Sequence, residues 1–219
     1  MAIAYVAKGQ REGDGSGSAT VDCTGADFLV ASVISQYADG LTAITYAGVA
    51  MTLAVKEVDE SQFNSTVYIY YLANPTTGSN SLTVTISGTP SVGILGTAVS
   101  GVSATGQPDA TGSADQEAGA PSTITAAITT VADNSWIFGV AWSERNLTDN
   151  TTLVARDTFS SAQFYAGDSN GAITPDGATN CILNVSATGM PTILAVASFK
   201  PDAGGSSYNF VPYKGFARL

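Results

Sequence analysis

Residues 67–88 carry the clearest pattern of apolar and polar positions in the chain. In residues 67–72 apolar or aromatic side chains occupy both faces of an extended strand, which predicts a strand inside a sheet. An Asn-Pro dipeptide and a glycine within residues 74–80 predict a turn. Residues 82–87 then alternate between large apolar and hydroxyl side chains, as a strand with one buried face does. The whole segment therefore predicts a β-hairpin.

Similar patterns predict strands along most of the chain, and nowhere do apolar residues recur with the period of a helix. The other predicted strands lie at residues 19–23, 28–36, 41–46, 51–58, 92–102, 122–128, 135–142, 151–156, 161–166, 181–187 and 192–200. Charged residues make up only 12% of the chain and 23 residues are glycine, a composition that suits pleated, half-buried surfaces joined by tight turns. We therefore expect an all-β fold.

The two sides of residues 103–121 resemble each other. This segment is acidic, rich in glycine and almost free of large apolar side chains, so we expect a long surface loop. Residues 52–57 recur at 152–157 as Thr-Leu, two small apolar residues and a basic-acidic pair. A Leu-x-Val pair and an Ala-Asp pair also recur in the same order, which predicts an internal duplication of the halves 1–102 and 122–200.

A duplicated set of strands predicts one jelly-roll-like antiparallel sandwich of two sheets, with pseudo-twofold symmetry, over residues 1–200. Two small sandwiches in tandem are the alternative. Residues 201–219 form a linker and an aromatic C-terminal arm in this interpretation. Because termini normally fray, the arm either folds back on its own domain or docks on a neighbouring protein. Its candidate contact residues are Tyr208, Phe210, Val211, Tyr213 and Phe216.

Charge and composition exclude several functions. The balance of 8 basic and 18 acidic residues gives a net charge of −10, which disfavours binding to nucleic acid. The chain has no histidine, so histidine-dependent catalytic triads and most zinc sites are excluded. Its start does not look like a signal peptide, and its apolar runs are too short to cross a bilayer as helices. We therefore expect a protein made in the cytoplasm, with no cofactor, no membrane partner and no enzymatic activity.

The two cysteines and one polar loop allow alternatives. Cys23 and Cys181 either form a disulfide that closes a long loop or are reduced, buried thiols, which the missing signal peptide favours. Asp168, Asn170 and Asp176 are spaced a little like calcium ligands, but the acidic residue that closes such a loop is missing, so we expect a turn.

Surface charge and aromatic side chains give two further candidates. The adjacent opposite charges at residues 56–57 and 156–157 predict solvated sheet edges. Aromatic residues exposed on a sandwich could bind a surface glycan, although the tryptophans among them fit a core better. The candidates are Trp136, Trp142, Phe164 and Tyr165.

Several segments together resemble a loosely defined group of β-sandwich proteins from tailed-phage structural genes and related bacterial sequences. They are TGAD followed by FLVASVIS, then ITYAGVAMT, a tyrosine-rich strand ending in LANP, and ILAVASFKP. The resemblance spans roughly residues 1–201. It implies a non-enzymatic virion component, such as a capsid decoration or tail-surface protein, bound to the major capsid or tail protein and to copies of itself.

Two alternatives remain because a fold does not determine a function. The first is a carbohydrate-binding module or adhesin. The second is a subunit of a self-assembling surface filament, in which the arm enters the next subunit.

Overall fold

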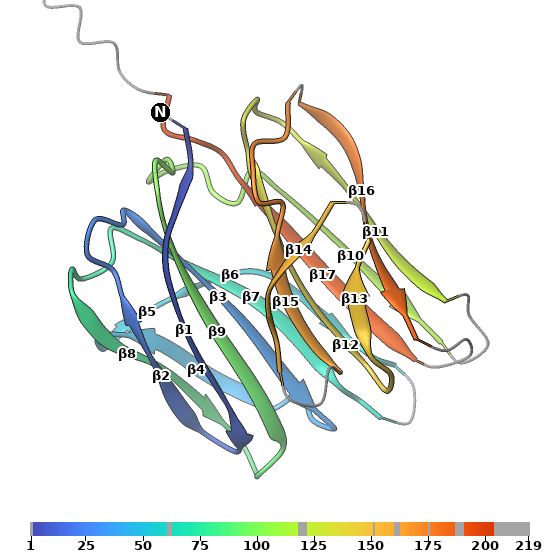
Figure 1. Ribbon diagram of the computed structural model, residues 1–219. Coiled ribbons are helices and arrows are strands. Elements are labelled where there is room, and N and C mark those ends of the chain that lie inside the picture. The colour runs from blue at the N-terminus through green and yellow to red at the C-terminus, as the bar shows by residue number, and fades with distance from the viewer. Residues whose placement is uncertain are drawn as a thin grey trace, which may run out of the picture.

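The computed structural model describes residues 2–60, 63–117, 122–150, 152–159, 163–174, 176–186 and 191–203 (Figure 1). Within these ranges the chain forms 17 strands and no helix, which confirms the all-β prediction. No helix that could cross a membrane therefore occurs in the described part of the chain. Every pair of neighbouring strands is antiparallel.

The first half of the chain forms two sheets. Its strands are β1 (Ala4–Asp14), β2 (Gly17–Asp22), β3 (Phe28–Gln36), β4 (Leu41–Tyr46), β5 (Val49–Ala50), β6 (Thr52–Val58), β7 (Thr66–Ala73), β8 (Ser79–Ile86) and β9 (Ser91–Ser100). The first large sheet has the strand order β1-β9-β3-β7-β6, and the first small sheet has the order β2-β8-β4-β5.

The second half repeats this topology. Its strands are β10 (Ala110–Gln116), β11 (Thr123–Thr130), β12 (Trp136–Ser143), β13 (Leu147–Asp149), β14 (Val154–Thr158), β15 (Phe164–Asp168), β16 (Gly177–Val185) and β17 (Thr192–Phe199). The second large sheet has the order β10-β17-β12-β15-β14, and the second small sheet has the order β11-β16-β13. Each strand thus corresponds to one in the first half, β1 to β10, β3 to β12 and β9 to β17, as the predicted duplication requires.

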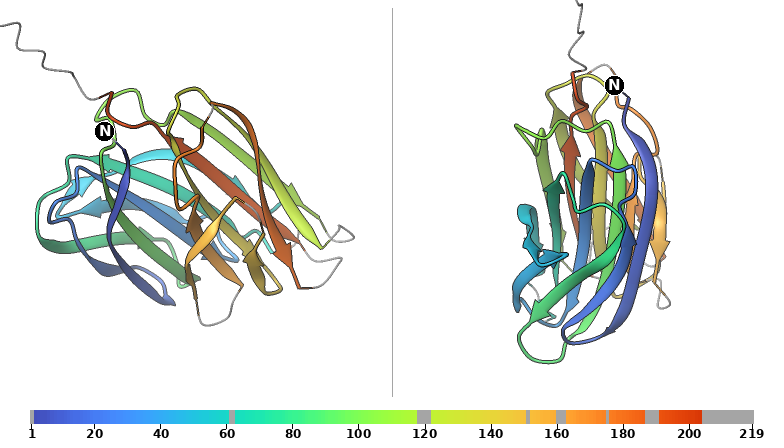
Figure 2. Two further views of the ribbon diagram at one scale, coloured as in Figure 1. Left: turned by 45° about the horizontal axis from the view of Figure 1, so that its top comes forward. Right: turned by 90° about the vertical axis from the view of Figure 1, so that its left-hand side faces the viewer.

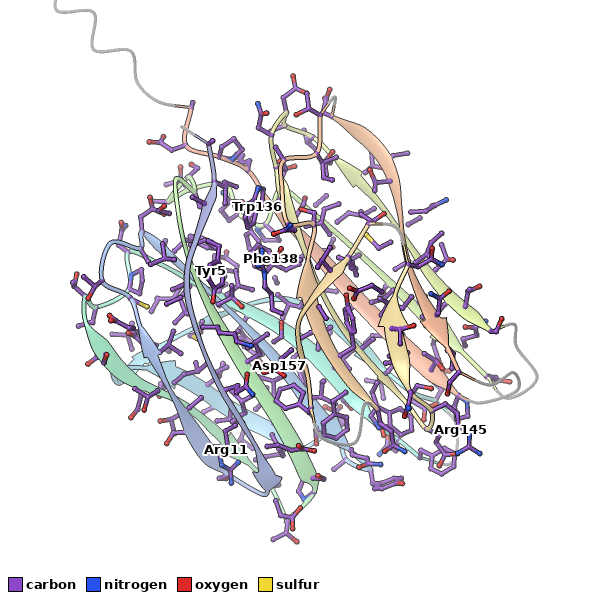
Figure 3. The ribbon with its side chains drawn as sticks, in the orientation of Figure 1. Tyr5, Arg11, Trp136, Phe138, Arg145 and Asp157 are labelled. Atoms are coloured by element: carbon purple, nitrogen blue, oxygen red, sulfur yellow. The ribbon has the colours of Figure 1, made fainter. Side chains whose placement is uncertain are left out.

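The sheets lie in four layers, with a large sheet of each half in the middle. One core fills the space between the small and large sheets of the first half, and another does so in the second half. A third core joins the two large sheets face to face, and Figure 3 shows Trp136 and Phe138 within it. The sandwich class is confirmed, but the sheets number four rather than two, because each half closes a sandwich of its own.

Side chains of the inner strands explain this layering. Every residue of β12 and β17, and all but the last residue of β3, is buried. A strand with apolar side chains on both faces needs a layer on each side. Each small sheet covers one face of the large sheet in its own half. The remaining faces of the two large sheets cover each other.

Residues 67–88 form two strands but no hairpin. β7 lies inside the first large sheet between β3 and β6, as the apolar pattern on both its faces predicted. β8 instead belongs to the first small sheet, between β2 and β4. The turn that follows Asn74 therefore carries the chain from one layer of the sandwich to the other. Apolar alternation identified both strands but not their partners.

The expected surface loop at residues 103–121 contains a strand. β10 pairs with β17 along its whole length, from Ala110 to Gln116. Three of its inward-facing residues, Ala110, Gly112 and Ala114, are small, and β11 passes close to them: a Cβ added to Gly112 would lie 2.2 Å from the carbonyl oxygen of Ala127. The composition that suggested a loop therefore reflects close packing of two strand backbones.

The same close approach occurs in the first half. A Cβ added to Gly9 of β1 would lie 1.8 Å from the carbonyl oxygen of Thr20 in β2. Gly9 pairs with Gly96 of β9, and Gly112 pairs with Val196 of β17, so the two glycines occupy corresponding strands and equivalent edges. Glycine is required at both places because any side chain would strike a neighbouring backbone.

The duplication differs in register from the repeated sequence letters. A β-bulge follows the second residue of β6, Leu53, and another follows the second residue of β14, Ala155. The bulges therefore correspond at a shift of 102 residues, whereas the sequence repeat suggested 100. As a result, Lys56 is the third residue after Leu53, where its strand bulges, whereas Arg156 directly follows Ala155.

Candidate interaction surfaces

The described chain begins and ends at the same end of the body, which we call the exit end (Figures 1 and 2). Ala2 and Ala203 line one shallow pocket there, together with Asn134. Pro201 forms a β-bridge with Val102, which fixes the last described residues to the body. The arm residues Tyr208, Phe210, Val211, Tyr213 and Phe216 lie outside the described residues, so their role stays a prediction.

The cysteines lie in different cores. Cys23 is buried between the sheets of the first half and Cys181 between those of the second, so both large sheets separate them. Both thiols are free, and the possible disulfide is wrong. Burial raises the pKa of the Cys181 thiol to about 12 and also raises the pKa of Cys23. Both residues therefore act as small apolar side chains at neutral pH.

The proposed glycan platform is buried. Trp142 and Tyr165 are inaccessible to solvent, and Trp136 and Phe164 are nearly so. The Tyr165 hydroxyl donates a hydrogen bond of 2.9 Å to Asp149 Oδ1. Because no face of these four aromatic rings is open to a sugar, the interpretation of the tryptophans as core residues is confirmed.

The calcium candidates serve other interactions. Asp168 is inaccessible and accepts two hydrogen bonds from the Arg156 guanidinium, at 2.6 and 2.9 Å. The same guanidinium donates to Asn170 Oδ1 at 2.9 Å, whereas the backbone N–H of Asp176 donates to Asp133. A cation already occupies the place that calcium would need. No group of three or more metal-binding side chains occurs among the described residues.

Arg156 also joins the two halves. Its guanidinium lies over the ring of Tyr5 from β1, and its central carbon is 4.7 Å from the ring centroid. Figure 3 labels Tyr5 and Asp157, which is the residue after Arg156 in the sequence. Lys8 of β1 donates to the Arg156 carbonyl oxygen at 2.6 Å and pairs with Asp157 at 3.5 Å. The hydrogen bonds with Asp168 raise the pKa of Arg156. The prediction of a solvated edge is therefore wrong for Arg156, while Lys56 pairs with Asp39 at 2.5 Å on the surface.

An aromatic patch lies at the opposite end of the body, where the two large sheets end. Tyr37, directly after β3, is 55% exposed, and its ring contacts Phe63 and Trp142, with centroid distances of 5.9 and 6.4 Å. Phe63 also contacts Trp142, at 6.0 Å. The Nε1–H of Trp142 is buried and has no acceptor among the described residues. We call Tyr37, Phe63 and Trp142 the end patch.

The end patch is held by its loops. The backbone N–H of Tyr37 donates to Ser65 Oγ at 3.2 Å, and that of Asp59 donates to the Ser65 carbonyl oxygen at 2.8 Å. Tyr37 has a φ of 61°, a left-handed conformation that is uncommon for residues other than glycine. The exposed position of its ring is therefore set by backbone geometry.

Acidic residues border the end patch. Asp59 and Glu60 follow β6, and the N–H of Glu60 donates to Asp115 Oδ2 of β10 at 3.3 Å. Asp115 is exposed, but partial desolvation raises its pKa, and the nearby charges of Asp59 and Glu57 raise it further. Asp115 and Trp142 pair with the same residue of β17, Ile193, from opposite sides. They therefore lie about 10 Å apart, two strand spacings.

The end patch could not be recognised in the sequence, because its three aromatic residues come from different parts of the chain. The sequence contained only a weak indication of an exposed aromatic residue. Tyr37 stands directly after a strongly apolar strand and before Ala-Asp-Gly, a place where a strand ends and a turn begins.

Comparison of the chain with protein families, with curated proteins and with solved structures gave no match. The resemblance to tailed-phage structural proteins therefore stays a prediction.

Proposed function

We propose that this chain is a non-enzymatic structural protein of a phage-like virion, a capsid decoration or tail-surface protein that is made in the host cytoplasm. It attaches to the major capsid or tail protein through its C-terminal arm and presents its layered β-body outwards. Copies of the chain are its second partner.

The place where the described chain ends supports this proposal most strongly. The described chain leaves the body at Ala203, beside Ala2 and at one end of the long axis (Figure 2). The following residues, 204–219, contain four of the chain's aromatic side chains. Aromatic anchors contribute most of the energy of many interfaces. A body whose described chain stops at one end, directly before an aromatic segment in the sequence, is suited to attachment by that segment.

The charge distribution supports it as well. Residues 204–219 contain Lys214 and Arg218 and no acidic residue, so the rest of the chain has six basic against eighteen acidic residues. An acidic body stays soluble at high local concentration, as a protein that coats a particle must. The basic arm would bind an acidic surface of its partner.

The polar groups near the candidate sites have structural roles. Arg156 and Asp168 neutralise each other, both thiols are buried, and Tyr165 donates to Asp149. This use of the reactive groups favours contact over catalysis. The adhesin alternative depended on the four aromatic residues that are buried, so we do not propose it.

Deletion of residues 208–219 tests the proposal. The deletion leaves every described residue in place, so the circular dichroism spectrum and the unfolding midpoint should stay unchanged. Purified full-length and shortened proteins are mixed with particles that lack the chain, and the particles are sedimented. We expect only the full-length chain in the pellet; equal recovery of both forms would contradict attachment through the arm.

A further inference from the structure

The end patch and the arm are complementary in chemistry. The patch combines an exposed tyrosine and a partly buried phenylalanine with a border that includes Glu60 and Asp115. The arm combines aromatic side chains with Lys214 and Arg218. Apolar burial would bind the two together, and opposite charges would favour and orient their encounter.

The end patch and the last described residue before the arm, Ala203, lie at opposite ends of the body. Asn134 shares the exit-end pocket with Ala203, whereas Trp142 is the last residue but one of β12, at the other end. Figure 3 shows this direction of the strand, from Trp136 near the exit end to Arg145 at the far end. At about 3.3 Å per residue, the end patch lies on the order of 25 Å from the place where the arm leaves.

We propose that the C-terminal arm of one copy docks on the end patch of the next copy, so that copies associate head to tail. The exposed ring of Tyr37 and the partly buried ring of Phe63 are the parts of the patch that an incoming segment would cover. This inference rests on the proposed structural role and names the surface through which copies bind. A copy whose arm is attached to the particle still presents its end patch to the arm of another copy.

Chain length allows the whole aromatic segment to dock only between copies, because its first residues are too close to Ala203 to reach the end patch of their own copy. A fully extended chain spans at most about 3.5 Å per residue, so Tyr208 reaches roughly 18 Å from Ala203 and Phe210 roughly 25 Å. Within one copy, Tyr208 would not reach the end patch and Phe210 would barely do so, so only the last part of the arm, with Tyr213 and Phe216, could dock there. The glycine and serine residues at 204–207 also make full extension unfavourable. A second copy placed end to end meets the whole aromatic segment.

The contact would be heterologous, because the exit end of one copy meets the far end of another. Such contacts generate rings where the rotation closes and open chains where it does not. The inference therefore predicts the result of mixing two variants, one with a damaged end patch and one with a damaged arm. The intact arm of the first can dock on the intact patch of the second, so the two form a pair but nothing larger.

Sedimentation velocity of the purified full-length protein tests this. The mass of the native chain should rise with protein concentration and fall on addition of salt, which screens the charged border. Tyr37→Ser damages the patch, and a Phe210→Ser, Tyr213→Ser double variant damages the arm; each alone should remain a monomer. Their mixture should form a one-to-one pair. Val49→Ser, which removes an apolar side chain exposed elsewhere, should associate as the native chain does.

A native chain that stays monomeric at every concentration, or a mixture of the two variants that does not associate, would overturn the inference. Tyr37 is exposed, so its replacement should leave the unfolding midpoint almost unchanged, which separates loss of contact from loss of fold. The experiment contains no particle. A negative result therefore removes the contact between copies and leaves attachment to a particle to the deletion experiment.

Discussion

Replacement of Gly9 or Gly112 by alanine tests the packing on which both sandwiches depend. The new Cβ would lie 1.8 Å from the Thr20 oxygen or 2.2 Å from the Ala127 oxygen. Both obstacles are backbone atoms, so no rotamer change relieves the overlap and the two strands must separate. Overpacking of this kind costs about 1–3 kcal/mol, and a clash with backbone belongs near the upper value.

The expected loss is about 3 kcal/mol in the free energy of unfolding for each variant. With a urea dependence of about 3 kcal/mol per molar, the unfolding midpoint should fall by roughly 1 M. The two losses should be similar, because the glycines occupy equivalent edges in the two halves. Urea titration followed by tryptophan fluorescence measures both.

Gly171→Ala is the matched control, because a Cβ there meets nothing within 4 Å. Its free energy of unfolding should change by less than about 0.5 kcal/mol. If Gly9→Ala and Gly112→Ala unfold at the urea concentration of this control, the close approach of the strand backbones is wrong.

Three further predictions concern charges and thiols. Arg156→Met leaves Asp168 buried without its partner and should lower the free energy of unfolding, measured in urea, by about 3–5 kcal/mol. Lys56→Met removes an exposed ion pair and should lower it by at most about 1 kcal/mol. Equal losses in the two variants would contradict the difference in burial. The pKa of Asp115 is raised above its ordinary value of 3.8, so its protonated form is favoured in the folded state, and Asp115→Asn should be more stable than the native chain at neutral pH. That advantage should disappear as the pH falls through the raised pKa towards 3.8, and an advantage that persists below pH 3.8 would contradict the stated cause. Both cysteines should react with a thiol reagent only after unfolding, and a denatured, unreduced chain with no reactive thiol would mean that the disulfide forms after all.

Local patterns predicted most strands. The apolar residues on both faces of β7 indicated an inner strand, and the alternation in β8 indicated a strand with one wet face, as the burial of β8 confirms. Strand partners could not be predicted in the same way, because a turn such as the one after Asn74 can lead to a neighbour in the sheet or to the opposite layer. Repeated sequence predicted the duplication, but small side chains in β10 made a strand resemble a loop.

The surfaces were harder to predict because they depend on distant residues. The sequence predicted a turn around Asp168, with calcium only as a weak alternative, and only the folded chain brings Arg156 against this carboxylate. The end patch likewise combines Tyr37, Phe63 and Trp142, which share no sequence motif. The arm was recognisable from composition alone, because aromatic residues near a terminus are unusual.

The most direct test of the structural role is quantitative mass spectrometry of phage-like particles purified from cells that make this chain. The proposal predicts that the chain remains with the particles through density-gradient purification, in many copies for each particle. Recovery of the chain only in the particle-free fraction would contradict it.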